Sequence, residues 1–198
     1  MSTYEKARLE TKNRIIQGFW KLYKQKPIHK ITIQNVADVS KVHRSTVYFH
    51  FQDVYQILEC IEADLLSNLG NIDCHTGETE YGLKSSGQTL FNEYRNHKEY
   101  LSILVKEKRD YSFAIKYREA MTSLMLNLAQ NPNTINSSKN QKLLEITANT
   151  VVDIFLQCAD DECLSFDDTQ KLLNGYMRLG FYKTLDEQFH VAGLLNPH

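Results

Sequence analysis

Apolar residues recur every three or four positions over most of this chain, which is the spacing of an amphipathic α-helix. The first run covers about 3–24, and two short runs begin after Thr32 and at Arg44. The pattern then predicts a longer helix at about 53–69, with Gly70 at its C-terminal end. These segments predict a small N-terminal group of three helices and a fourth helix that leads out of it.

Helical patterns continue through the rest of the chain, at about 83–96, 98–107, 112–129, 138–160 and 166–186. The chain has only three prolines and eight glycines, so long helices form easily and a many-turned β-sandwich is disfavoured. We therefore predict an all-α fold of about nine helices. Its expected parts are a three-helix domain (1–52), a connecting helix (53–70) and a C-terminal helical bundle (71–198).

Charge is distributed unevenly along the chain, although the formal net charge is only -1. Residues 1–50 contain ten Lys and Arg residues against three Asp and Glu residues, a local balance of +7, and 51–198 carry the compensating −8. A basic segment suits a polyanion, because cations that approach phosphates release condensed counterions. A solvated basic helix face gives the same charge, so charge by itself does not decide between the two.

The cysteines form no C-x-x-C pair and lie near no histidine cluster at the spacing of metal ligands. We expect reduced and mostly buried thiols, and we expect neither a metal nor a cofactor. The four residues are Cys60, Cys74, Cys158 and Cys163, of which Cys74, in a polar stretch, is expected to be the most exposed.

The chain shows no sign of secretion, membrane insertion or a known catalytic motif. Its charged start lacks the apolar centre of a signal peptide, and no stretch approaches the ~20 apolar residues of a membrane span. We therefore expect a cytoplasmic protein that does not associate with membranes. No G-x-S-x-G, P-loop, G-x-G-x-x-G or H-E-x-x-H motif occurs, so we do not expect an enzyme.

The stretch Thr32–Phe51, TIQNVADVSKVHRSTVYFHF, has the organisation of a helix-turn-helix. The two helices must cross closely, and the small side chain of Ala37 suits the contact. Val42, Val47 and Phe51 are expected in the core, so we assign them no contact with DNA. The second helix then keeps its outer face and its N-terminus for a major groove ~12 Å wide.

This stretch resembles the motif of the TetR family of transcriptional regulators, roughly T-hydrophobic-x-x-I-A-x-x-A-G-V-S-x-G-T-hydrophobic-Y-x-H-F. The resemblance covers about 8–60 and is most specific at Tyr48–Phe51. It implies a repressor that binds a palindromic operator in double-stranded DNA as a homodimer and is released by a small-molecule effector. The body beyond residue 70 is similar to the family in length and helical pattern.

The resemblance also implies which residues contact DNA. The set comprises Thr32, Lys41, His43, Arg44, Ser45, Thr46, Tyr48 and His50. Arg44 is the best candidate for reading guanine, because its planar guanidinium matches O6 and N7. Tyr48 and His50 resemble residues that position the protein on the DNA backbone. Two alternatives stay open, a helix cap for His43 and half-buried packing for Tyr48.

Three positions depart from the family pattern. Lys41 occupies the place of the turn glycine, which predicts backbone strain if the position requires positive φ. Ser45 replaces a second glycine, and Val54 replaces a lysine that is expected to contact a phosphate. These departures give weight to an alternative function, a co-regulator that acts through a protein partner and binds DNA weakly or not at all.

Side chains of the middle helices are candidates for a ligand pocket, although plain core explains them equally well. They are Tyr94, Tyr100, Leu104, Phe113, Tyr117, Met121 and Phe155. The helices at 138–160 and 166–186 are apolar over too wide an arc for one buried face, and the resemblance implies that they form the dimer interface. The candidates there are Val151, Ile154, Leu172, Tyr176 and Leu179. A monomer core is the alternative.

Overall fold

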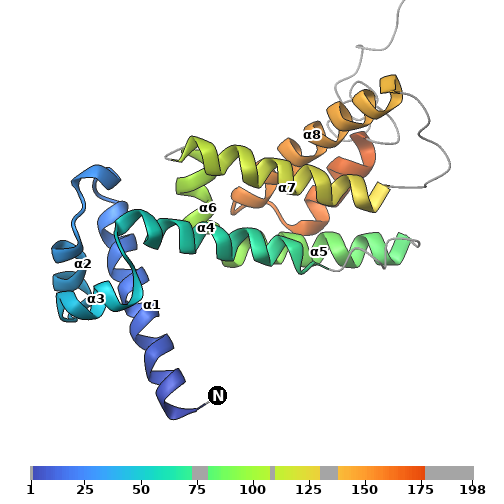
Figure 1. Ribbon diagram of the computed structural model, residues 1–198. Coiled ribbons are helices and arrows are strands. Elements are labelled where there is room, and N and C mark those ends of the chain that lie inside the picture. Colours follow the sequence, from blue (N-terminus) through green and yellow to red (C-terminus); the bar gives the residue numbers. More distant parts are fainter. Residues whose placement is uncertain (1, 73–79, 108–109, 130–137, 177–198) are drawn as a thin grey trace, which may run out of the picture. The chain divides into compact units, whose positions relative to one another are not determined.

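The computed structural model of this protein is all-α, and it describes residues 2–72, 80–107, 110–129 and 138–176 (Figure 1). Over these ranges the chain forms nine α-helices, one 3-10 turn and one π-helical turn, which confirms the predicted fold class. The chain divides between Ser67 and Asn68, inside a helix, into two compact units. We call the N-terminal unit the head and the C-terminal unit the body.

The head contains α1 (Thr3–Tyr23), α2 (Ile33–Ser40), α3 (Arg44–His50) and most of α4 (Val54–Gly70). The 3-10 turn η1 (Ile28–Lys30) connects α1 to α2. Apolar side chains from all four α-helices fill its core, with the largest contributions from Ile15, Phe19, Val36, Val47 and Ile57. Val42, which we expected in the core, is half-buried because it lies in the turn between α2 and α3.

A glycine allows α1 and α2 to approach each other closely. A Cβ atom on Gly18 would lie 2.0 Å from Ser40 Oγ and 3.2 Å from both the Cβ and the backbone nitrogen of Ser40. Ser40 is buried, and its hydroxyl has no hydrogen-bond partner. Ala37, the small residue expected where α2 and α3 cross, is buried as well.

The turn after α2 contains a left-handed residue. Lys41 has φ 54° and ψ 46°, and no other non-glycine residue in the described ranges has positive φ. The turn therefore keeps a glycine-type conformation although a lysine occupies it. Arg14 of α1 holds this turn, because its Nη2 donates to the carbonyl oxygens of Ser40 and Lys41, each at 3.0 Å.

Replacing Lys41 with glycine is expected to stabilise the head by about 1 kcal/mol. The left-handed conformation costs a non-glycine residue about 1–2 kcal/mol, and the greater freedom of glycine in the unfolded chain offsets part of this gain. Urea unfolding monitored by circular dichroism measures the change. Gln17→Gly is the matched control, since Gln17 is exposed in the middle of α1, where glycine costs about 1 kcal/mol. If both substitutions lowered the free energy of unfolding by a similar amount, the backbone at Lys41 would not be strained.

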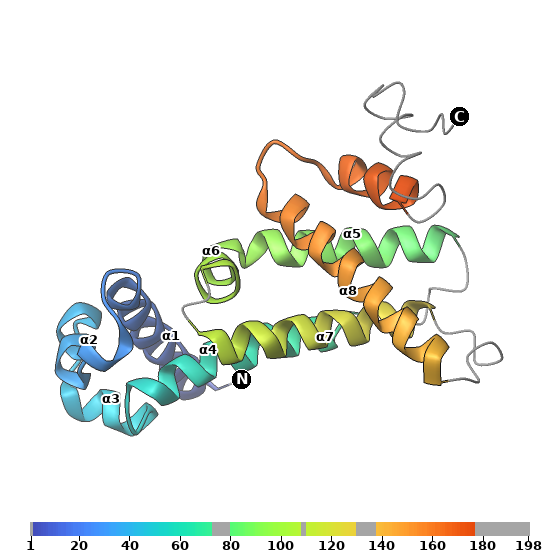
Figure 2. The same cartoon turned by 90° about the horizontal axis from the view of Figure 1, so that it is seen from above.

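The body contains α5 (Glu80–Asn96), α6 (Lys98–Leu101), the π-helical turn η2 (Ser102–Lys106), α7 (Tyr111–Ala129), α8 (Ser138–Asp160) and a helix over 166–176. Within the body, α8 packs against both α5 and α7 (Figure 2). Phe91 of α5 is at the centre, edge-on to Phe155 at 6.1 Å and to Phe166 at 5.6 Å between ring centroids.

Two of the predicted body helices differ from those observed. The single helix expected over 98–107 is a short α-helix followed by η2, because the chain passes from α-helical to π-helical winding at Ser102. The helix expected over 166–186 is seen to residue 176, and the rest lies outside the described residues. In the described part of the chain, no helix is both long and apolar enough to cross a membrane.

The cysteines only partly follow the expectation of buried thiols. Cys158 is buried, Cys60 is half-buried and Cys163 is exposed, while Cys74 lies outside the described residues. Burial raises the pKa of the Cys158 thiol above its usual value. The expectation holds for Cys158 and is wrong for Cys163, which stands in the loop between α8 and the helix at 166–176.

Candidate nucleic-acid interface

The N-terminus of α2 is built by a reciprocal capping box. Thr32 Oγ1 accepts a hydrogen bond from the backbone nitrogen of Asn35 at 3.2 Å, and Asn35 Oδ1 accepts one from the backbone nitrogen of Thr32 at 3.2 Å. Lys26 Nζ donates to the same Oδ1 at 3.0 Å. The exposed Thr32 thus stands at a helix N-terminus with a lysine beside it, which is an electrostatic setting that favours an anion.

The N-terminus of α3 is capped by His43. Its Nδ1 accepts from the backbone nitrogen of Ser45 at 3.4 Å and lies 2.7 Å from the Ser45 hydroxyl. His43 is therefore a helix cap, and whether it also contacts DNA is not decided by this. His43 and Ser45 both remain exposed, so their contacts with DNA stay predictions.

Arg44 and Tyr48 lie together on the outer face of α3. Arg44 Nη2 donates to the Tyr48 hydroxyl at 3.0 Å, and Arg44 Cζ lies 5.3 Å from the centroid of the Tyr48 ring. Tyr48 is 47% exposed, which places it on the surface and not in the packing of the head. Val47 occupies the opposite, fully buried face, while Thr46 and His50 are half-buried between the two faces.

Two cations of α1 extend this surface beyond α3. The Arg8 guanidinium lies 5.4 Å from the centroid of the Phe49 ring, and Lys12 Nζ lies 5.9 Å from that of Phe51. Burial lowers the pKa of His50 below its usual value, and the positive charges of Arg8 and Lys12 lower it further. The local field around the end of α3 is therefore positive, which attracts an anion such as a phosphate.

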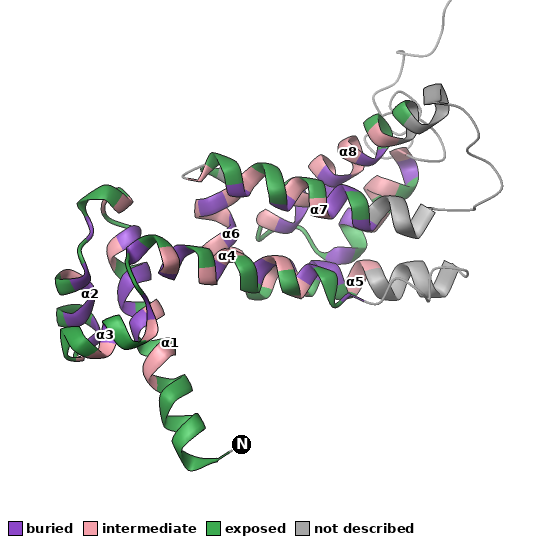
Figure 3. Cartoon of the chain, in the orientation of Figure 1, coloured by how far each residue is buried: buried purple, intermediate pink, exposed green. Residues whose placement is uncertain are grey.

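Sequence reasoning did not identify Arg8, Lys12 and Phe49 as part of this surface. The spacing of Arg8 and Lys12 places them on one face of α1, but the pattern does not tell which element that face meets. The first turns of α1 are exposed on all sides (Figure 3), so no apolar stripe orients them. Phe49 lies between polar residues and is 63% exposed, which is unusual for a large aromatic side chain.

The chemistry of the α3 face suits contact with a nucleic acid. The helix sequence RSTVYFH contains no carboxylate, and its exposed side chains offer the guanidinium of Arg44 and the hydroxyls of Ser45 and Tyr48. Such donors make hydrogen bonds to base edges and to phosphate oxygens. The exposed Lys41, in the turn that precedes α3, adds a further positive charge.

The predicted pocket residues in the body are mostly packed core. Six are buried, namely Tyr94, Leu104, Phe113, Tyr117, Met121 and Phe155, and Tyr100 is half-buried. The body also holds an open cavity of about 1160 Å³, and Tyr94 is the one member of this set among the residues that line it. The structure thus places the core and the cavity in different parts of the body.

The predicted dimer residues lie on two helices of the body. Val151 and Ile154 of α8 are half-buried, as are Leu172 and Tyr176 in the helix at 166–176, and Leu179 lies outside the described residues. Ile146, also on α8, is 54% exposed. Half-buried apolar side chains are compatible with a partner surface and with a monomer core, so dimerisation stays a prediction.

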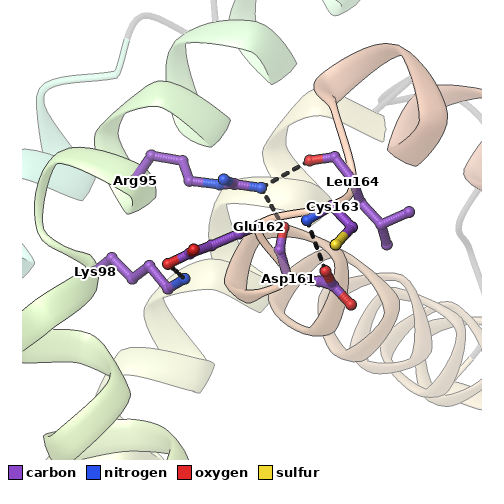
Figure 4. Close-up of polar contacts among 6 residues, drawn as sticks. All are labelled: Arg95, Lys98, Asp161, Glu162, Cys163 and Leu164. Atoms are coloured by element: carbon purple, nitrogen blue, oxygen red, sulfur yellow. Dashed lines mark hydrogen bonds and ion pairs between the residues drawn. The ribbon is translucent and has the colours of Figure 1, made fainter.

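Comparisons with known proteins do not assign this chain to a family, because no family model and no curated protein matches it. The features of the chain that bear on function are therefore the chemistry of the α3 face and the cavity in the body, whose lining includes Lys98, Asp161 and Glu162 (Figure 4).

Proposed function

We propose that this protein is a DNA-binding transcriptional regulator of the TetR type, which represses by binding a palindromic operator as a homodimer. The observation that carries the proposal is the surface of α3, where Arg44 and Tyr48 are exposed and two cations of α1 lie over the rings of Phe49 and Phe51. In a helix-turn-helix the N-terminal residues of the second helix contact base edges in the major groove. Arg44 is the first residue of that helix.

In this function Arg44 reads a guanine through O6 and N7, and the hydroxyl and charged side chains around it bind phosphates. Thr32 binds one phosphate at the N-terminus of α2, and Arg8 and Lys12 bind others beside α3. The hydrogen bond from Arg44 to Tyr48 restricts the rotamers of the guanidinium before DNA arrives. This restriction lowers the entropy that Arg44 loses on binding.

Dimerisation supports the same function, because two α3 helices about 34 Å apart read the two halves of a palindrome. We assign the interface to α8 and the helix at 166–176, where Val151, Ile154 and Leu172 are half-buried. A small-molecule effector bound in the body releases the operator by favouring a different arrangement of the dimer. Effector and operator then oppose each other through one coupling free energy, typically about 1–3 kcal/mol.

Selection of bound DNA from a random pool tests this function, and we expect the recovered sites to share a palindrome. The affinity for such a site should fall steeply with salt, with a slope of log affinity against log salt near −0.9 per phosphate contact. The full chain is used, with an unrelated duplex of equal length as the control. A co-regulator that acts through a protein partner would recover no common site and show a flat salt dependence.

A further inference from the structure

Four of the seven residues of α3 are exposed (Figure 3), and one of them is the aromatic, purely apolar Phe49. A helix turns by about 100° per residue, so Phe49 lies about 160° around α3 from Val47, which is fully buried in the head. Ser45, one turn before Phe49, has the same place on the outer face of the helix. The Phe49 side chain, which is 63% exposed, is therefore directed away from the core of the head.

Two neighbouring groups contact the ring of Phe49. The ring of His50 is edge-on to it, with 5.2 Å between the centroids and an interplanar angle of 87°. The guanidinium of Arg8 lies over it, 5.4 Å from the centroid, because the face of an aromatic ring attracts a cation. In the proposed function Arg8 binds a phosphate, so the apolar ring stands beside a group that contacts the DNA backbone.

Double-stranded DNA offers one apolar group that such a ring can contact in the major groove. This group is the C5-methyl of thymine, whereas the other three bases present hydrogen-bond donors and acceptors there. Apolar side chains, phenylalanine among them, contact this methyl group in complexes with DNA. An exposed phenylalanine on the outer face of α3 therefore has the chemistry to distinguish thymine from cytosine.

We propose that Phe49 reads one thymine in each half-site of the operator, through contact of its ring with the C5-methyl group. The inference rests on the proposed function, because it requires α3 to lie in the major groove. Phe49 is five residues beyond Arg44, or about 7.5 Å along the helix axis, which exceeds the spacing of base pairs of about 3.4 Å. The two side chains therefore read different base pairs, Arg44 through hydrogen bonds and Phe49 through an apolar contact.

The same contacts allow a second role, in which Phe49 only supports Arg8 against a phosphate. Loss of the ring would then weaken binding to every sequence alike and reduce the salt slope by about one per protomer, as loss of a phosphate contact does. A methyl contact has the opposite consequences. Its loss affects one base pair of each half-site and leaves the salt slope unchanged, because no charge is removed.

Replacement of thymine by deoxyuridine tests the contact from the side of the DNA, because it removes the methyl group and leaves base pairing unchanged. In the operator selected with the full chain, each thymine is replaced together with its symmetry mate, and fluorescence anisotropy measures the affinity. We expect one pair of thymines at which replacement lowers the affinity about tenfold, since each half-site loses the burial of one methyl group. With cytosine at this pair, 5-methylation of the cytosine should strengthen binding.

The variant Phe49→Ala tests the contact from the side of the protein. It should bind the thymine and deoxyuridine operators with affinities within about twofold of each other, because the ring that contacts the methyl group is gone. Phe49→Leu should keep part of the methyl effect, since leucine retains an apolar side chain. Tyr111→Ala is the matched control, because Tyr111, an aromatic residue of α7 in the body, is 65% exposed and should leave the methyl effect unchanged. Unfolding midpoints show that all three variants are folded.

Failure of this contact and failure of the proposed function are distinguishable. A palindrome at which no thymine responds to loss of its methyl group would overturn the inference and leave the DNA-binding function intact. A methyl effect that survives Phe49→Ala, or a salt slope that falls in this variant, would do the same. Selection that recovers no common site would overturn both. A methyl effect that is lost in Phe49→Ala at an unchanged salt slope would support both.

Discussion

Replacement of Arg44 with alanine is expected to lower the affinity of the dimer for its operator about 100-fold or more, because each half-site loses an arginine–guanine contact worth about 1–3 kcal/mol. Discrimination at one base pair of each half-site should disappear as well. Fluorescence anisotropy with the selected operator and with versions changed at each base pair measures both effects. Thermal stability should change by only a few tenths of a kcal/mol, since Arg44 is exposed and its contact with Tyr48 spans a single helical turn.

Two charge-matched variants separate base reading from general attraction. Arg8→Ala should weaken binding to all sequences alike and reduce the salt slope by about one per protomer, as expected for a phosphate contact. Lys116→Ala removes the same charge from an exposed position of α7 in the body and should change neither quantity. If Arg44→Ala behaved like Arg8→Ala, with every base pair discriminated as before, Arg44 would not read the sequence.

Replacement of Gly18 with valine is expected to destabilise the head by about 3 kcal/mol or more, which is a large part of the about 5–15 kcal/mol that stabilises a typical domain. Even one added carbon would overlap Ser40 Oγ at 2.0 Å, and rotation of the hydroxyl would still leave Ser40 Cβ and the Ser40 backbone nitrogen 3.2 Å away. Urea unfolding measures the loss. The same substitution should also abolish operator binding, because α2 packs on α1 and α3 packs on α2.

A rescue experiment identifies the contact responsible. In Gly18→Ala two effects on the stability of the head oppose each other. The overlap with Ser40 should cost about 1–3 kcal/mol, and the better helix propensity of alanine should return about 1 kcal/mol of this. Ser40→Ala removes the atom that clashes, so the pair Gly18→Ala/Ser40→Ala should recover most of the loss. Ser40→Ala alone should be close to neutral, because the Ser40 hydroxyl is buried without a partner. If the double variant were as unstable as Gly18→Ala, the Ser40 hydroxyl would not be the group that excludes a side chain at position 18.

The helices of this chain were predictable because their apolar residues follow a 3.6-residue period. The long helices expected at 3–24 and 138–160 correspond to α1 and α8 within one residue at each end. The turn at Lys41 was predictable in a different way, since a position that matches a glycine in a similar motif has the positive φ that glycine accepts. Both predictions needed only the sequence of the segment itself, and no knowledge of its neighbours in the fold.

The cavity and the cationic part of the interface were not predictable, because both depend on contacts between segments far apart in the sequence. Periodicity marks Phe113 and Met121 as inward-facing, but it does not distinguish a packed core from the wall of a cavity. The cavity exists only after α5, α6, η2, α7 and α8 have packed together, because its lining residues come from all of these elements. The sequence likewise does not reveal that Ser40 lies against Gly18 and excludes a side chain there.

Cys163 gives the body a natural point for covalent labelling. It is exposed in the loop that carries Asp161 and Glu162, whereas Cys158 is buried and the raised pKa of its thiol disfavours the reactive thiolate. A maleimide dye would therefore react faster with Cys163 than with Cys158. With Cys60 and Cys74 replaced by serine, its emission would report events at the cavity wall.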